Sequence, residues 1–316
     1  MKSISLVSVP LALLAVSVSV HANSYIYGTL SATLGQDASD NIATQRDETG
    51  ASLDDSYSLI GFAGEEEMNT GLVVGARYEL VVRADDGEVD TDDGMAHLSL
   101  TGDIGELKFG RIPTVYRAVA DYRWLFDESS ARRDTQLRQV PDAISWSRQY
   151  GQWQAALLGA FDGGITRQQL ALAYTHERGV FRIAADRRQN RFASAGQPLD
   201  DLSEVSIGAE LNVGGDILIT GVATRFELDE SETAALQLQQ PGNDATKAYG
   251  SLMVAQYSNN GNTFALGYEN ANWELEDDQR FLFELARGLS ERSLAWLGVS
   301  SAEDGTAFRI GLKHNW

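Results

Sequence analysis

The 316-residue chain contains no cysteine and only five prolines. Without cysteine there is no disulfide framework, no thiolate metal site and no thiol nucleophile. Basic residues are also scarce, because 25 Lys and Arg stand against 45 Asp and Glu, for a formal net charge of −20. Binding of nucleic-acid phosphates needs clustered Lys and Arg, so this balance argues against nucleic acid as a partner. Composition alone is typical of an acidic soluble protein, but the order of the residues contradicts that interpretation.

The only long uncharged stretch with an apolar centre lies at the N-terminus, from Ser3 to Val20 after a single positive charge at Lys2. Val20-His21-Ala22 has the small-x-small spacing of a signal-peptidase site, which predicts a cleaved signal peptide over residues 1–22. The alternative, a transmembrane anchor, is disfavoured because the stretch is short and the cleavage pattern follows at once. The mature chain, residues 23–316, is therefore expected to be exported.

The mature chain is organised by alternation with period two, the pattern of β-strands. Leu72, Val74 and Ala76 begin one apolar set, and Arg77 and Glu79 belong to the opposite set. In the strands at 216–226, 246–257 and 291–299 the pattern does not decide which face is outward. Sixteen strands are predicted, at 24–34, 56–67, 71–83, 95–101, 105–111, 142–149, 152–161, 167–176, 180–189, 203–212, 216–226, 246–257, 262–270, 279–288, 291–299 and 306–316.

Short and long breaks alternate between these strands. Gln149-Tyr150-Gly151 and Gly214-Gly215-Asp216 have the composition of tight turns, whereas 35–55, 84–94 and 227–244 are longer and acidic. This alternation predicts that all tight turns lie at one end of the sheet and all long loops at the other. About ten residues per strand with one short and one longer connection per hairpin suit a membrane barrel.

Periodicity alone fits a soluble antiparallel sandwich equally well. Export, an even strand count and a long, charged polar face favour an outer-membrane barrel, whose closure leaves no exposed sheet edge. Aromatic residues near strand ends also favour such a barrel, because outer-membrane barrels carry aromatic girdles at both membrane interfaces. These residues are Tyr25, Tyr27, Phe62, Tyr78, Trp146, Trp153, Tyr174, Tyr257, Tyr268 and Trp316. The predicted fold class is all-β, a transmembrane antiparallel β-barrel of about sixteen strands.

Three segments of the sequence resemble the general trimeric porins of the Gram-negative outer membrane. Ser58 to Leu72 (SLIGFAGEEEMNTGL) resembles the family's second-hairpin motif, and Ala96 to Arg111 (AHLSLTGDIGELKFGR) resembles the hairpin before its constriction loop. Tyr25-Ile-Tyr-Gly28 resembles the first strand. The terminal strand, with Phe308, Ile310, Leu312 and Trp316, is similar to the aromatic signal read by the barrel-assembly machinery.

The resemblance implies a homotrimer in the cell outer membrane, in contact with its lipids and lipopolysaccharide. Each barrel would form a water-filled passive channel for ions and small hydrophilic solutes, without a cofactor or a metal. The third extracellular loop, here about 112–141, would fold into the lumen and narrow it. The charged residues of that loop that would line the constriction are Arg117, Arg123, Arg132, Arg133, Arg138, Asp121, Asp127 and Glu128.

In this family, basic residues on the barrel wall face acidic residues on the loop. Arg111 occupies the family's Gly-Arg position before the loop and is the first candidate for the wall. The chain departs from the pattern at Leu59 and Ser145, where a basic residue is common, so Arg77 and Arg148 are candidates to replace part of the basic set. The preferred ion stays open, because the long loops are acidic and the constriction loop is rich in arginine.

No catalytic constellation is found in the sequence. The mature chain has three histidines, none with a partner at metal-ligand spacing. His97 and Ser99 share a strand face, as a barrel hydrolase would need, but Ala96, Leu98 and Leu100 form the apolar set, so the pair should face the lumen. The chain is therefore predicted not to be an enzyme. The alternatives are a substrate-selective channel on the same fold, an outer-membrane hydrolase, and a surface adhesin or receptor.

Overall fold

Strands form in the computed structural model almost exactly where residues alternate between apolar and polar. The structure describes residues 23–36, 51–54, 58–82, 89–90, 94–115, 139–161, 164–189, 191–192, 198–199, 202–227, 247–271, 278–302 and 305–316. The predicted signal peptide and most of the predicted constriction loop lie outside these residues. Within them, no helix is long and apolar enough to cross a bilayer.

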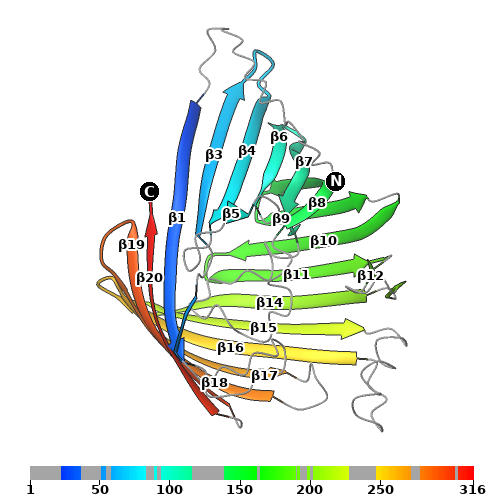
Figure 1. Ribbon diagram of the computed structural model, residues 1–316. Coiled ribbons are helices and arrows are strands. Elements are labelled where there is room, and N and C mark those ends of the chain that lie inside the picture. The colour runs from blue at the N-terminus through cyan, green and yellow to red at the C-terminus, as the bar shows by residue number, and fades with distance from the viewer. Residues whose placement is uncertain are drawn as a thin grey trace, which may run out of the picture.

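Eighteen strands of the described residues form one antiparallel sheet. Two of them are short: β2 (Ala51–Asp54) extends the pairing of β1, and β5 (Val89–Asp90) extends that of β4. The other sixteen form the barrel (Figure 1): β1 (Asn23–Gln36), β3 (Ser58–Glu67), β4 (Val73–Val82), β6 (Ala96–Gly102), β7 (Gly105–Pro113), β8 (Gln139–Tyr150), β9 (Trp153–Phe161), β10 (Ile165–His176), β11 (Gly179–Arg188), β14 (Leu202–Gly214), β15 (Ile217–Glu227), β16 (Lys247–Asn259), β17 (Asn262–Ala271), β18 (Asp278–Gly288), β19 (Ser293–Ala302) and β20 (Gly305–Asn315).

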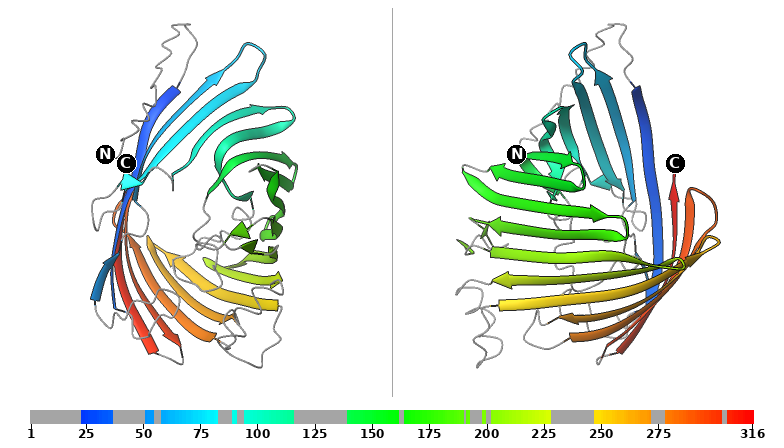
Figure 2. Two further views of the ribbon diagram at one scale, coloured as in Figure 1. Left: turned by 45° about the vertical axis from the view of Figure 1, so that its right-hand side comes forward. Right: turned by 180° about the vertical axis from the view of Figure 1, so that it is seen from behind.

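The barrel closes where β1 meets β20. Their register runs from Thr29 opposite Asn315 to Gln36 opposite Phe308. Beyond it, the backbone N–H of Trp316 donates to the carbonyl of Gly28 at 3.1 Å. The strands consequently wrap around one interior (Figure 2), and β12 (Arg191–Phe192) with β13 (Pro198–Leu199) form a separate small hairpin. A closed antiparallel ladder satisfies the backbone polar groups of its strands internally, as a membrane requires. The predicted sixteen-stranded barrel is confirmed.

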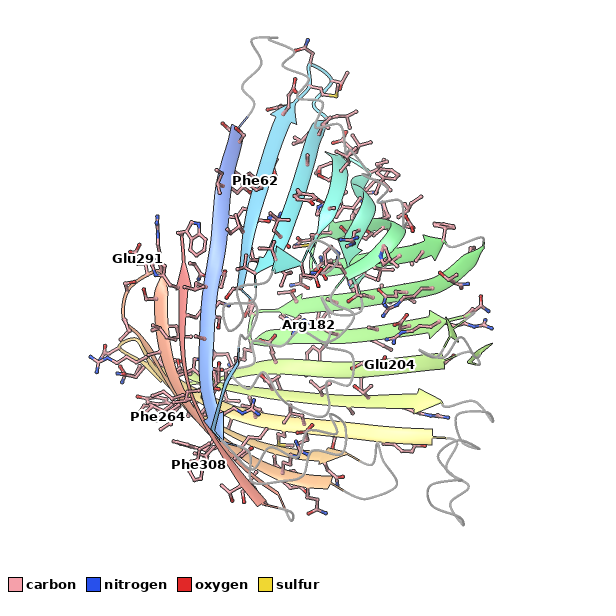
Figure 3. The ribbon with its side chains drawn as sticks, viewed as in Figure 1. Phe62, Arg182, Glu204, Phe264, Glu291 and Phe308 are labelled. Atoms are coloured by element: carbon pink, nitrogen blue, oxygen red, sulfur yellow. The ribbon has the colours of Figure 1, made fainter. Side chains whose placement is uncertain are left out.

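The two faces of the wall have opposite character. On β17 and β18 the outward residues Leu266 and Phe281 are 63% and 64% exposed, whereas Glu269 and Glu284 on the inward face are fully buried. Figure 3 shows Phe264 and Phe308 likewise pointing away from the barrel. Exposed apolar side chains outside and charged ones inside are the reverse of a soluble protein. This inversion is the arrangement of a barrel surrounded by lipid.

The structure shows which face points outward on β15, β16 and β19, the three strands for which the sequence pattern did not decide it. On β15 the inward residues include Thr220 and Thr224, both buried. On β16 the inward residues Leu252 and Val254 are apolar, which hides the alternation in the sequence. On β19 Trp296 stands opposite the buried Gly311 of β20 on the lumen side. Apolar residues on the lumen face of β16 and β19 are therefore the reason that periodicity failed on these two strands.

Aromatic side chains gather on the outer face at the tight-turn end. Trp153 and Tyr174 stand opposite each other with ring centroids 4.8 Å apart, and Trp146 Nε1 donates to the carbonyl of Ile104 at 2.9 Å. Amphipathic rings are favoured at the level of lipid headgroups. The predicted girdle is present at these positions, but Tyr27 belongs to the lumen face instead, opposite Gly61.

Candidate functional site: the barrel lumen

A network of ion pairs lies on the lumen wall across β10, β11 and β14. The Arg167 guanidinium donates from Nε to both carboxylate oxygens of Asp186, at 3.0 and 3.1 Å. Arg188 donates from Nε to Oδ2 of the same carboxylate at 3.0 Å and approaches Glu204, with 3.6 Å between Nη2 and Oε2. A carboxylate held by two guanidinium groups is a fixed, oriented element of the wall.

The network continues toward the tight-turn end of the same strands. Arg182 on β11 forms an ion pair with Glu210 on β14, and Figure 3 labels Arg182 together with Glu204. The hydroxyl oxygens of Ser206 and Thr224 are 3.0 Å apart and extend the polar surface to β15. The wall therefore carries both signs of charge on its lumen side, with Arg167, Asp186 and Glu204 buried and Arg182, Arg188 and Glu210 partly exposed. Charged groups on a pore wall are the basis of ion selectivity.

This network is not among the site residues predicted from the sequence. A signal for it is nevertheless present in the sequence, because Arg182 and Asp186 share one face of their strand by alternation, and Glu204 and Glu210 share one face of the next strand. Direct cross-strand neighbours interact. The register, which pairs Asp186 with Glu204, is what brings the groups together, and it depends on the connections between the strands.

A second polar group lies on the lumen face of β1 and β4. The Tyr27 hydroxyl donates to Oε1 of the buried Glu79 at 2.5 Å. The guanidinium carbon of Arg77 is 5.2 Å from the centroid of the Tyr27 ring, within cation–π distance. Gly61 of β3 lies between Tyr27 of β1 and Glu79 of β4, and a Cβ at Gly61 would be 2.2 Å from Tyr27 Cζ. A glycine at this point lets the tyrosine cross its neighbouring strand to reach the carboxylate.

The chain that leaves β7 turns inward. Ile112 and Val115 are buried against an apolar stretch of wall that includes Leu158 and Ala171. The backbone N–H of Val115 donates to Oε1 of Gln169 on β10 at 3.0 Å. A segment that leaves β7 at Pro113 and contacts β10 must lie on the lumen side of β8 and β9. The start of the predicted constriction loop is thus directed into the lumen.

The predicted wall residues fall at different places. Arg77 lies on the lumen face, as described. Arg148 is exposed opposite Ala155, in the outward set with Trp146, at the tight-turn end. This corrects its predicted position, because β8 presents Ser145 and not Arg148 to the lumen. Arg111 stands opposite Ala96 beside a bulge, and its Nη1 donates to the carbonyl of Gly94 at 3.3 Å.

The charged residues predicted within the loop, from Arg117 to Arg138, lie outside the described residues. The assembly-signal residues Phe308, Ile310 and Leu312 project from the outer face of β20, and Trp316 follows it. Their roles, and that of Arg111 at the constriction, stay predictions.

The possible hydrolase pair lies on the lumen face. His97 stands opposite Arg77 and Ser99 opposite Gly75, while the intervening Leu98 is 59% exposed on the outer face. Among the described residues, no three His, Asp or Glu side chains are grouped as a metal ion would require.

A closed barrel with an apolar outer face and a charged lumen defines a membrane-spanning channel protein. The sequence pattern of the family described as Gram-negative porin matches residues 10–316, so the chain belongs to the Gram-negative porin family. It is an outer-membrane porin. No curated relative matches the chain in sequence.

Solved structures share the fold at low sequence identity. The anion-selective porin of Comamonas acidovorans is 18% identical with a TM-score of 0.72, over 93% of this chain and 100% of that chain. A loop-deleted OmpT, an outer membrane protein of Vibrio cholerae, is 16% identical with a TM-score of 0.71, over 93% and 99%. OmpF of Salmonella typhi, in complex with daunomycin, is 14% identical with a TM-score of 0.70, over 93% and 97%.

Proposed function

We propose that this porin is a passive diffusion channel for ions and small hydrophilic solutes and has no enzymatic activity. The observation that carries the proposal is the network of Arg167, Asp186, Arg188 and Glu204 on the inner wall of a closed barrel. Charges fixed to one another on a wall interact with permeating ions through their field and need no binding step. Diffusion through such a lumen follows the concentration gradient and is limited by the narrowest cross-section.

Liposome swelling tests this mechanism. Vesicles that contain the protein are expected to swell in solutions of neutral sugars, at rates that fall smoothly as the sugar becomes larger. The rates should increase linearly with concentration, because no site saturates. Saturation at millimolar concentration, or swelling with one sugar among several of equal size, would contradict passive diffusion. Swelling that matches protein-free vesicles would contradict a channel altogether.

We further propose that the mature chain is residues 23–316, that it assembles as a homotrimer, and that the loop from about 112 to 141 forms the constriction. The inward turn at Ile112 and Val115 supports the last point. A trimer form described for OmpT of Vibrio cholerae, whose fold this chain shares at 15% identity and a TM-score of 0.68, supports the second. The loop charges listed above, together with Arg77 and Arg111, are the proposed constriction residues.

We propose that the C-terminal residues guide assembly of the barrel, and Trp316→Ala tests it. Trp316 closes the seam between β1 and β20, where its ring occupies the space above Gly28. Removal of the ring is expected to lower the yield of folded barrel in the outer membrane several-fold, measured as the heat-modifiable fraction on gels. Trp153→Ala is the matched control, since it removes another outward tryptophan at the same end. Equal yields from the two variants would remove Trp316 from this role.

A further inference from the structure

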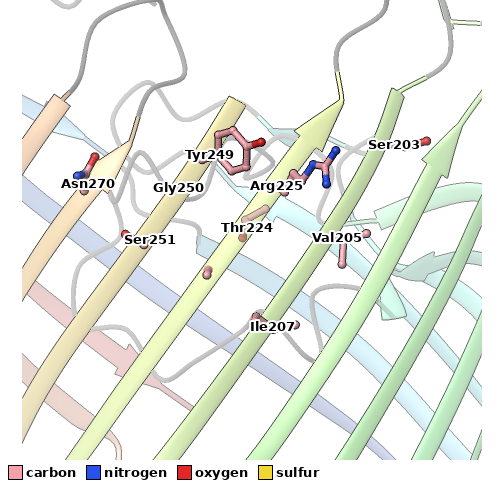
Figure 4. Close-up of a pocket in the computed structure, with 10 residues that line it drawn as sticks. Ser203, Val205, Ile207, Thr224, Arg225, Tyr249, Gly250, Ser251 and Asn270 are labelled. Atoms are coloured by element: carbon pink, nitrogen blue, oxygen red, sulfur yellow. The ribbon is translucent and has the colours of Figure 1, made fainter. Parts of the chain in front are cut away.

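A hollow of about 640 Å³ lies on the outer face of β14, β15 and β16, and Val205, Ile207 and Tyr249 contribute to its lining (Figure 4). Val205 and Ile207 belong to the outward set of β14 and are 45% and 54% exposed, so this hollow faces lipid and is closed to dissolved solutes. A solute in the channel meets the inner wall instead. Because the inner wall of such a barrel is mostly polar, an aromatic side chain on it is a candidate contact for a passing solute.

Trp296 of β19 is such a side chain, and it lies on the lumen face near the tight-turn end. It stands opposite Gly311 of β20, while the next residue, Leu297, is 40% exposed on the outer face. A Cβ at Gly311 would be 2.3 Å from both Cε2 and Nε1 of the indole, and a Cβ at Gly298 would be 3.4 Å from Cζ3. The ring therefore lies across two glycines, against a stretch of wall that has no side chains.

Part of the indole surface is exposed on the lumen side. The Trp296 side chain is partly exposed, and its neighbour across β18 is Ala286, which is too small to cover the ring. Leu294, two residues nearer the tight turn, lies on the same face and extends the apolar surface. An aromatic ring favours offset-stacked or edge-to-face contact with another aromatic ring. This surface can therefore receive a planar aromatic solute.

The charges beside the ring are mainly positive. Both diagonal neighbours of Trp296 on β20, Arg309 and Lys313, are basic. Arg309 extends over β1, where a Cβ at Gly35 would be 3.2 Å from its Cγ, whereas Lys313 is exposed. On β18 the acidic neighbour, Glu284, is fully buried. Diagonal neighbours are roughly 7–8 Å apart, so the Lys313 ammonium group, on its four-carbon stem, can approach the edge of the indole.

We infer that Trp296 and Lys313 form a weak binding site for planar aromatic carboxylates at the tight-turn end of the lumen. The aromatic ring of the solute stacks on the indole, and its carboxylate pairs with the Lys313 ammonium group. A neutral sugar has neither an aromatic ring nor a charge, so the site leaves the expected swelling rates for sugars unchanged. The inference rests on the proposed channel for access of the solute, whereas the contacts belong to the folded wall.

Current noise of the purified mature protein in planar bilayers tests the site, with benzoate as the probe. Reversible binding of benzoate in the open lumen is expected to add noise at a characteristic frequency, and its concentration dependence gives the dissociation constant. Trp296→Leu should weaken binding about two- to tenfold through loss of stacking, and Trp296→Phe should retain part of the affinity. Lys313→Gln should weaken binding up to about fivefold. Trp153→Leu, at an outward tryptophan of the same end, is the matched control and should bind as the native protein does.

Two further solutes separate stacking from simple attraction between charges. Cyclohexanecarboxylate has the charge of benzoate without the aromatic ring, and benzyl alcohol has the ring without the charge. Both are expected to bind more weakly than benzoate. Equal binding of benzoate and cyclohexanecarboxylate, or unchanged binding of benzoate by Trp296→Leu, would overturn the inference.

Saturation-transfer NMR of the protein in lipid nanodiscs keeps this inference apart from the proposed channel, because it detects bound benzoate without any current. A benzoate signal that Trp296→Leu lowers, in a protein that passes no current, would leave the site standing and contradict only the channel. A conducting protein whose signal is the same in the native and Trp296→Leu forms would contradict only the site.

Discussion

Replacement of Arg167 by Ala is expected to lower the free energy of unfolding by about 3–5 kcal/mol, the usual effect of removing one partner from a buried ion pair. The Asp186 side chain is fully buried, so loss of its bidentate partner leaves a charge that Arg188 only partly compensates. Urea-induced unfolding of the folded barrel in lipid vesicles measures the change. The free energy should recover in large part when Asp186→Ala is added, because the uncompensated charge is then removed as well.

The control for this prediction is Arg148→Ala, which removes an exposed guanidinium from the outer face. Its expected effect is within about 0.5 kcal/mol, as for most surface substitutions. A double-mutant cycle between Arg167 and Asp186 isolates the pairwise term. If the two single variants and the double variant show additive losses, the ion pair does not stabilise this part of the wall.

Reversal of one charge on the lumen wall is expected to change the ion preference. In Arg182→Glu, the new carboxylate stands beside Glu210 on the face that lines the lumen. Two unit charges about 6 Å apart in water interact by about 0.7 kcal/mol, and reversal from +1 to −1 doubles this change for each ion, with opposite signs for K⁺ and Cl⁻. The K⁺ to Cl⁻ permeability ratio should therefore change in favour of K⁺ by up to about 2.8 kcal/mol, or roughly a hundredfold before screening by salt. Measurement of the reversal potential in a salt gradient gives this ratio directly.

Arg148→Glu makes the same charge change on the outer face and should leave the permeability ratio at its native value. A similar shift in both variants would mean that net charge, and not position on the lumen wall, sets the preference. No shift in Arg182→Glu would show that permeating ions do not sense this part of the wall.

Strand positions were predictable from the sequence because each strand carries its own period-two signal. The strand expected at 279–288, for example, is β18, Asp278–Gly288. The side of a strand that faces outward was predictable only where the residues on its lumen side are polar. Leu252 and Val254 put apolar side chains on both faces of β16, and alternation then carries no information about direction.

The site was less predictable than the fold, since side chains on one strand meet their partners through the register of another. Arg148 was expected on the lumen wall as a substitute for the basic residues missing at Leu59 and Ser145, but one step of alternation separates it from the inward Ser147. Tyr27 was expected in the aromatic girdle, and only the missing side chain at Gly61 lets it reach Glu79. Such contacts depend on cross-strand geometry that local periodicity does not contain.

Conductance of the purified protein in a planar bilayer tests most directly whether the lumen is an open, water-filled channel. The protein is expected to produce stepwise openings in groups of three, with currents proportional to voltage and to salt concentration. Single steps would contradict the trimer and leave the channel intact. A protein that inserts as a folded barrel and produces no steps in molar salt would contradict the channel itself.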